Sequence, residues 1–86
     1  MRCEAYIEIN QEPCRDPILA ERVLAALHRE ERSAGQSTPC ESTDVVSGLW
    51  IIELPPRLAF RVQRDRQIAA RVEIDGRVAM VGVGLP

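Results

Sequence analysis

Three cysteines and one histidine are the residues of this 86-residue chain whose types could hold a metal. Thiolate and imidazole are ligands that zinc prefers, and together these side chains would make up a Cys3His set. Their spacing argues against such a site, because no two cysteines lie within the two to four intervening residues typical of zinc ligands. We therefore expect no metal and three free thiols, with Cys3 facing the core beside Ala5 and Ile7. The four residues are Cys3, Cys14, Cys40 and His28.

Cys14 precedes a predicted helix N-terminus, where the helix dipole favours a thiolate. Its only possible histidine base, His28, lies about three turns along the same predicted helix. The paired acids offer no better catalytic site, because Glu4 and Glu8 occupy alternate, solvated positions of a predicted strand. The sequence therefore predicts no catalytic residue and no cofactor, and a Cys/His metal or thiol site is the weakest alternative.

The composition is that of a globular domain, with 45% hydrophobic and 28% charged residues. The net charge is −2, all basic residues are arginine, and acids are interspersed among them, which argues against a strong nucleic-acid-binding surface. The N-terminal residues contain no apolar signal region, and no window of 18 residues is continuously apolar. We expect one cytoplasmic domain over 1–86 with no membrane contact.

The clearest structural pattern is a hairpin near the C-terminus. Apolar and polar residues alternate on both sides of Asp75-Gly76, a dipeptide that favours tight hairpin turns. A two-residue loop would pair Val72 with Ala79 and Ala70 with Val81 on one, almost wholly apolar face. The opposite face would carry two other pairs, Arg71 with Met80 and Glu73 with Val78.

Three more strands are predicted upstream of this hairpin, over 3–9, 49–54 and 58–63. Because proline cannot donate to a sheet ladder, we expect a three-residue turn at 55–57. The turn at 55–57 would pair Phe60 with Ile52, and a second three-residue turn at 64–66 would pair Phe60 with Ala70. Residues 44–48 are expected to form a short strand or a bulge.

One amphipathic helix is predicted from Asp16-Pro17 to residues 32–34, because aspartate caps a helix and proline suits its first position. Gly35 would follow the helix end, and residues 35–42 would form a polar loop. The helix carries an apolar stripe at helical spacing, formed by Ile18, Leu19, Val23, Ala26 and Leu27.

These elements predict an α+β fold in the order β-α-β-β-β-β. Both the helix and one sheet face have apolar surface to bury, so the two should pack as a two-layer sandwich. The sheet would contain four or five mainly antiparallel strands. The sequence leaves open whether the first strand lies at the edge or in the middle of this sheet.

The functional prediction depends on the sheet face turned away from the helix. Val78 and Met80 are expected there, close to Ala59 and Ala69 and beside Arg61 and Arg71. Methionine and arginine are enriched at protein interfaces, and large exposed apolar patches are rare on monomers. We therefore predict a small non-enzymatic interaction module, namely an adaptor, regulator or inhibitor that acts through its sheet face or an edge strand. Its partner would be another protein or a second copy in a homodimer.

The alternative function is nucleic-acid binding through the arginine-rich C-terminal half. Two features oppose it, since the expected face has no aromatic stacking residue and Glu73 and Asp75 interrupt the positive charge. The arginines in question are Arg57, Arg61, Arg64, Arg66, Arg71 and Arg77.

Overall fold

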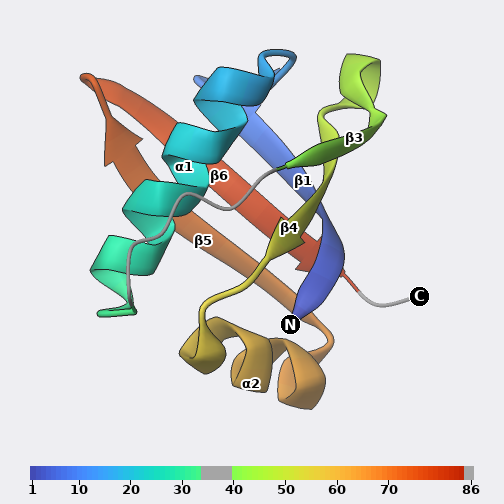
Figure 1. The fold of residues 1–86 in the computed structure, drawn as a ribbon, viewed down its shortest axis with the longest axis vertical. Helices are drawn as coiled ribbons and strands as arrows, with labels where there is room; N and C mark the ends of the chain where they lie inside the picture. The colour runs from blue at the N-terminus through green and yellow to red at the C-terminus, as the bar shows by residue number, and fades with distance from the viewer. Residues whose placement is uncertain (34–39, 85–86) are drawn as a thin grey trace.

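The computed structural model describes residues 1–33 and 40–84, and its elements are drawn in Figure 1. Six strands form one antiparallel sheet in the order β3-β4-β1-β6-β5, with the short β2 paired to β1. The predicted two-layer α+β fold is confirmed, with two helices instead of one. The elements are β1 (Arg2–Ile9), β2 (Glu12–Pro13), α1 (Pro17–Glu30), β3 (Glu41–Asp44), the 3-10 helix η1 (Val45–Ser47), β4 (Leu49–Glu53), α2 (Pro56–Asp65), β5 (Gln67–Ile74) and β6 (Arg77–Gly84).

The β5–β6 hairpin has the predicted register. Val72 pairs with Ala79 and Arg71 with Met80, and both turn residues, Asp75 and Gly76, have positive φ. This is the conformation that a two-residue turn requires to match the twist of its strands. Because the side-chain period of a strand is two, the correct register also places every β5 and β6 side chain on its predicted face.

The first strand, β1, lies in the middle of the sheet between β4 and β6. Its inward residues Ala5, Ile7 and Ile9 are buried. Ala5 lies opposite Trp50 of β4, and Ile7 lies opposite Val81 of β6. The N-terminal strand therefore joins two segments of the core that are far apart in sequence.

Helix α1 begins as predicted, because the Asp16 carboxylate accepts a hydrogen bond of 3.0 Å from the Ile18 amide and Pro17 opens the first turn. The predicted stripe is wrong at Ile18, which is 68% exposed. Ile18 precedes the buried Ala20 by two residues, or about 200° around the helix, and therefore faces outward. The helix ends at Glu30, and Gly35 lies outside the described residues.

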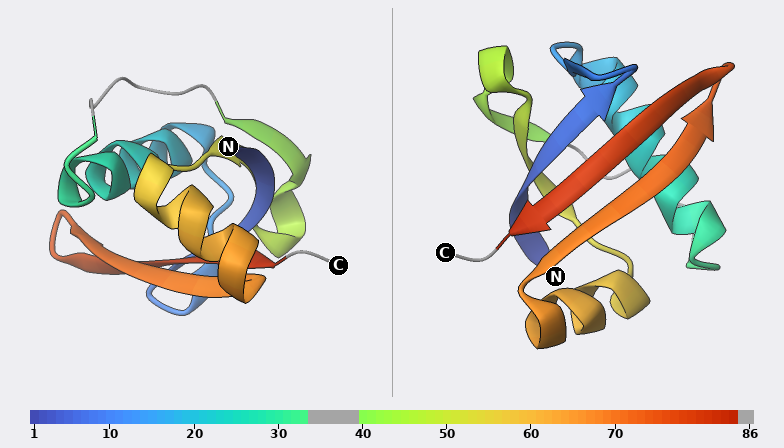
Figure 2. Two further views of the ribbon diagram at one scale, coloured as in Figure 1. Left: turned by 90° about the horizontal axis from the view of Figure 1, so that it is seen from below. Right: turned by 180° about the vertical axis from the view of Figure 1, so that it is seen from behind.

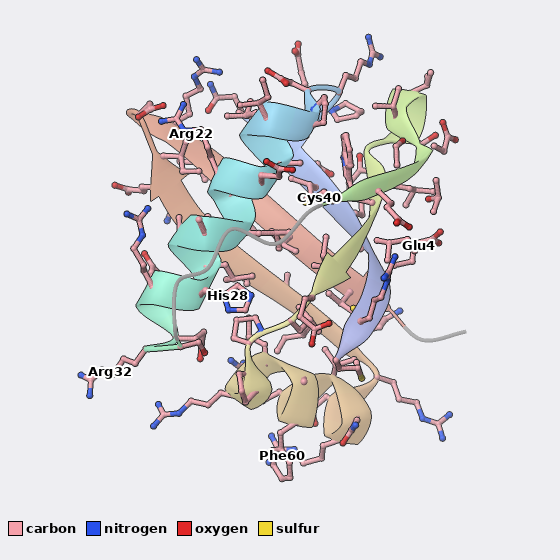
Figure 3. The ribbon with its side chains drawn as sticks, in the orientation of Figure 1. Glu4, Arg22, His28, Arg32, Cys40 and Phe60 are labelled. Carbon is pink, nitrogen blue, oxygen red and sulfur yellow. The ribbon has the colours of Figure 1, made fainter. Side chains whose placement is uncertain are left out.

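The largest correction concerns residues 56–65, which form helix α2 instead of the predicted strand over 58–63. Leu58 and Val62 are buried, whereas Phe60 is 64% exposed and points away from the rest of the protein (Figure 3). The pairs predicted for Phe60 therefore do not form, since Ile52 lies opposite Cys3 and Ala70 opposite Val81.

The error has a physical reason. Alternation of Leu58, Phe60 and Val62 resembles a strand, but the buried set 58, 59 and 62 has helical spacing. Pro56 occupies the first helical position, where the missing amide breaks no hydrogen bond. Arg66 then ends the helix with φ of 62° while its amide donates to the Val62 carbonyl at 2.8 Å.

The segment before β4 also differs from the prediction. Glu41 and Ser42, expected in a loop, belong to the edge strand β3, which has an irregular register between Ser42 and Asp44. The segment after β3 is the 3-10 helix η1 rather than a strand. Asp44 caps it by accepting a 3.1 Å hydrogen bond from the Val46 amide, which satisfies an amide that the short helix leaves free.

Helix α1 packs on one face of the sheet, and α2 lies at the end of the sheet where β4 stops and β5 begins (Figures 1 and 2). An ion pair between Arg22 of α1 and Asp75 in the β5–β6 turn joins the helix to the hairpin. The other face of β1, β6 and β5 is covered by no helix of the described chain, as the view from behind in Figure 2 shows. We call this surface the open face.

Candidate interaction surface

An apolar row crosses the open face and continues onto β4, the neighbour of β1. Tyr6 of β1 lies opposite Leu49 of β4 on one side and opposite Gly82 of β6 on the other, and Gly82 lies opposite Ala69 of β5. Ile51 occupies the next outward position of β4, and both it and Leu49 are partly exposed. This row gives the open face an apolar centre.

A hollow of about 420 Å³ interrupts this row at Gly82. It is lined by Tyr6, Ala69, Gly82 and their neighbours. A Cβ built at Gly82 would meet no atom within 4 Å, so the space above this glycine is open. The hollow exists because a strand position that normally carries an outward side chain has none.

Three of the four predicted surface residues lie together on the open face. Arg71 and Met80 are directly opposite each other, and Val78 is the next outward residue of β6. They share a second hollow, of about 480 Å³, with Asn10 and Gln11 from the β1–β2 turn. Asn10 forms two hydrogen bonds with Val78. The Asn10 side-chain oxygen accepts from the Val78 amide at 3.2 Å, and the Asn10 backbone amide donates to the Val78 carbonyl at 2.9 Å.

Arg61, the fourth predicted residue, belongs to α2 and is therefore not on a sheet strand. Ala59, which was expected close to Met80, is buried in the same helix. Arg61 is exposed. The pKa of Asp65 is lowered, mainly because its carboxylate accepts a hydrogen bond from Arg64, and the positive charge of Arg61 lowers it further. The sequence placed Arg61 beside Arg71 because it predicted a strand over 58–63. Since these residues form helix α2, Arg61 does not share a sheet face with Arg71.

The charge around the apolar row is mainly negative. Glu4 and Glu8 flank Tyr6 on β1, and Glu73 lies beside Arg71 on β5. Incomplete hydration raises the pKa of the Tyr6 hydroxyl, and the hydrogen bond that this hydroxyl donates to Glu8, together with the negative charge of Glu8, raises it further. The tyrosine therefore stays neutral and donates a hydrogen bond to an acid at the rim of the row.

The cysteines do not come together with His28. Cys14 is buried, and desolvation raises the pKa of its thiol, so the predicted position before α1 does not produce a thiolate. Burial is also the main cause that raises the pKa of Cys40 to about 11, with negative charge from Glu21 adding to it. Across residues 1–33 and 40–84, no group of three or more histidine, cysteine or acidic side chains could hold a metal.

Sequence reasoning missed Tyr6, Leu49 and Ile51 as members of this surface. Their alternation with Ala5, Trp50 and Ile52 did indicate outward positions, but only the pairing of β1 with both β4 and β6 brings them to the same side of the sheet as Met80. The signal available in the sequence was the number of large apolar residues at outward positions of two strands.

Comparison of the chain with protein-family models, with curated proteins and with solved structures found no match.

Proposed function

We propose that this protein is a small interaction module that binds another protein through its open face. The observation that carries the proposal is the apolar row centred on Tyr6, which continues toward Val78 and Met80 on a face that no helix of the described residues covers. Exposed apolar surface of this kind is typical of interaction sites. An adaptor, a regulator and an inhibitor would all use it in the same way.

The charged residues around the apolar row indicate the chemistry that a partner surface should have. Glu4, Glu8 and Glu73 surround the apolar row, whereas Arg71 is the arginine beside Met80. A complementary surface would bring aliphatic side chains to the row and arginine or lysine to its edge. This arrangement disfavours nucleic acid, because phosphates would meet more carboxylates than guanidinium groups on the open face.

Helices that could carry the chain across a membrane are not found among the described residues. Glu4, Glu8 and Glu73 beside the apolar row favour a basic protein partner over an anionic lipid surface.

The test compares two charge substitutions in a pull-down from native cells. Met80→Asp places a carboxylate in the open face, and Phe60→Asp places one at an exposed apolar residue of α2 as the matched control. We expect one protein to be retained by the wild type and by Phe60→Asp but lost with Met80→Asp. Retention by Met80→Asp, or an equal loss in both variants, contradicts the proposal. A folded circular dichroism spectrum for each variant is required for the comparison.

A further inference from the structure

The outward side of α2 carries arginines on both sides of a phenylalanine. Its residues are Arg57, Phe60, Arg61 and Arg64, and all four are exposed. Since each residue turns an α-helix by about 100°, their spacing places them within about 100° of one another around the helix. Figure 3 shows the ring of Phe60 on the side of α2 turned away from the sheet. We call these four residues the α2 face.

The opposite side of α2 packs into the core and fixes the direction of the α2 face. Leu58, Ala59 and Val62 are buried there. All three aromatic residues of the chain are among those the structure describes, and of these Phe60 is exposed, Tyr6 is half-buried and Trp50 is buried. The helix therefore presents the most accessible aromatic ring of the protein to solvent.

Positive charge is concentrated on this helix. Residues 56–66 carry four of the eleven arginines and one acid, Asp65, although the whole chain has a net charge of −2. Arg64 donates hydrogen bonds of 3.1 and 3.3 Å to the Asp65 carboxylate. Arg57 and Arg61 form no ion pair with any residue in the described ranges. Two guanidinium groups of the α2 face are therefore available to an anionic ligand.

The two features that oppose nucleic-acid binding by a sheet surface do not apply to α2. Glu73 lies near the end of β5 and Asp75 in the turn that follows, whereas α2 precedes the start of β5. These acids therefore do not interrupt the α2 face. The aromatic residue that the sheet surface was expected to lack is Phe60 on α2.

An exposed ring between arginines suits a single nucleic-acid strand better than other anionic partners. Unpaired bases stack on aromatic rings, and guanidinium groups bind the phosphates of the same strand. A duplex keeps its base faces stacked and would use the arginines alone. An anionic membrane would receive one apolar side chain from α2, because the other apolar residues of this helix are buried in the protein. An acidic protein surface would pair with the arginines but would offer the ring no base.

We propose that the α2 face binds single-stranded nucleic acid, with one base stacked on Phe60 and phosphates at Arg57, Arg61 and Arg64. Arg57 and Arg64 are seven residues apart, or about 10 Å along the helix axis, so the contact extends over a few nucleotides. Stacking tolerates any base, and we expect little sequence preference. The inference is independent of the open face, where carboxylates outnumber arginines.

The first experiment measures the fluorescence anisotropy of a short labelled oligothymidylate during titration with the wild-type protein. We expect saturable binding in about 50 mM salt and about 20-fold weaker binding in about 200 mM salt, as three phosphate contacts to a single strand predict. Duplex DNA and vesicles of phosphatidylcholine with phosphatidylserine, each at the same phosphate concentration, serve as competitors. Absence of saturable binding, or displacement of the strand by either competitor as effective as that by unlabelled oligothymidylate, overturns the proposal.

The second experiment tests stacking on Phe60. Phe60→Leu keeps an apolar side chain but removes the ring, and should weaken binding of the strand roughly tenfold. Phe60→Tyr keeps the ring and should bind as the wild type does. Because Phe60 is 64% exposed, both variants should fold normally. Wild-type affinity of Phe60→Leu, or an equal loss in both variants, contradicts a stacked base.

The third experiment tests the phosphate contacts with two exposed arginines. Arg61→Gln removes one contact and should make the slope of log affinity against log salt shallower by about 0.7. Arg77→Gln removes the same charge at the start of β6, beyond the β5–β6 turn, and should leave the slope unchanged. Equal changes in the two slopes would mean that the strand responds to overall charge, and would overturn the site.

Discussion

Tyr6 lies directly opposite Gly82 across the β1–β6 ladder, so in the middle of the open face an aromatic residue neighbours a residue that has no side chain. The hollow between them is bounded on β5 by Ala69, which has only a methyl group to fill it. A side chain from another protein can enter this space without any rearrangement of the sheet. The pair therefore marks the point where we expect the partner's apolar residue to insert.

A side chain at Gly82 should fill this hollow and weaken partner binding without disrupting the fold. Gly82→Val should leave the fold intact, since an added Cβ meets nothing within 4 Å, and should stabilise the protein by about 0.5 kcal/mol because glycine is unfavourable within a strand. The same change should weaken partner binding at least tenfold. Urea denaturation and a pull-down measure the two effects. A destabilised protein, or one that binds its partner as the wild type does, would contradict this description of the face.

Helix α2 can be tested by two alanine substitutions two residues apart. Leu58→Ala should cost about 3 kcal/mol, because Leu58 is 1% exposed and its removal leaves a cavity. Phe60→Ala should change the stability by less than about 0.5 kcal/mol, because Phe60 is largely exposed. In the strand that the sequence predicted, both residues would have been buried on one face. Similar losses of unfolding free energy for the two variants would therefore contradict helix α2 and favour the strand predicted over 58–63.

The β5–β6 hairpin and the start of α1 could be predicted because local chemistry determines them. Asp75-Gly76 selects a two-residue turn, and the turn alone sets the register of both strands. Asp16-Pro17 likewise caps and opens α1 without help from distant residues. For these elements, the hydrophobic pattern and the signals at their ends agree.

Residues 56–65 could not be assigned from their pattern, because Leu58, Ala59 and Val62 fit one helical face while 58, 60 and 62 fit one strand face. The local signal was Pro56, which can open a helix as well as interrupt a sheet. Unlike Pro17, which follows the capping residue Asp16, Pro56 follows another proline and has no side-chain cap before it, so its position did not distinguish the two structures.

The candidate surface was predicted where it depended on hairpin register and missed where it depended on strand order. Arg71, Val78 and Met80 follow from the turn at Asp75-Gly76. Tyr6 and Leu49 required knowing that β1 lies in the middle of the sheet, which is decided by contacts between segments more than 40 residues apart. No local pattern in the sequence carries that information.

Gly48 is expected to be essential for stability. Its φ is +72°, and a Cβ there would come within 2.7 Å of the Ile7 carbonyl oxygen in the centre of the sheet. Gly48→Ala should therefore destabilise the protein by on the order of 3 kcal/mol, through backbone strain and displacement of β1. Gly76→Ala is the matched control, because Gly76 also has positive φ but has open space around it. Thermal unfolding should show the larger loss for Gly48, and equal losses would contradict the close contact.

The thiol of Cys40 should react slowly until the pH is high. Its pKa is about 11 in the folded protein, against 9.0 for an ordinary thiol. Its ionisation therefore lowers the free energy of unfolding as the pH rises from about 9 toward 11, because the unfolded chain loses the proton first. The alkylation rate, followed by mass spectrometry of the Cys40 peptide, should still increase above pH 10.

Glu21→Gln should lower the pKa of Cys40, because the negative charge of Glu21 contributes to raising it. Glu30→Gln, at the other end of α1, removes the same charge at an exposed residue and serves as the control. An unchanged alkylation profile in Glu21→Gln would show that the charge of Glu21 does not reach the thiol.

The most direct test of the open face is site-specific photo-crosslinking in native cells, with a photoreactive phenylalanine analogue at position 80 or at position 60. We predict a discrete adduct with one protein from position 80, where Met80 lies on the open face, and none from position 60 on α2. The absence of an adduct at position 80, or the same adduct from both positions, would contradict the claim that this face binds a protein.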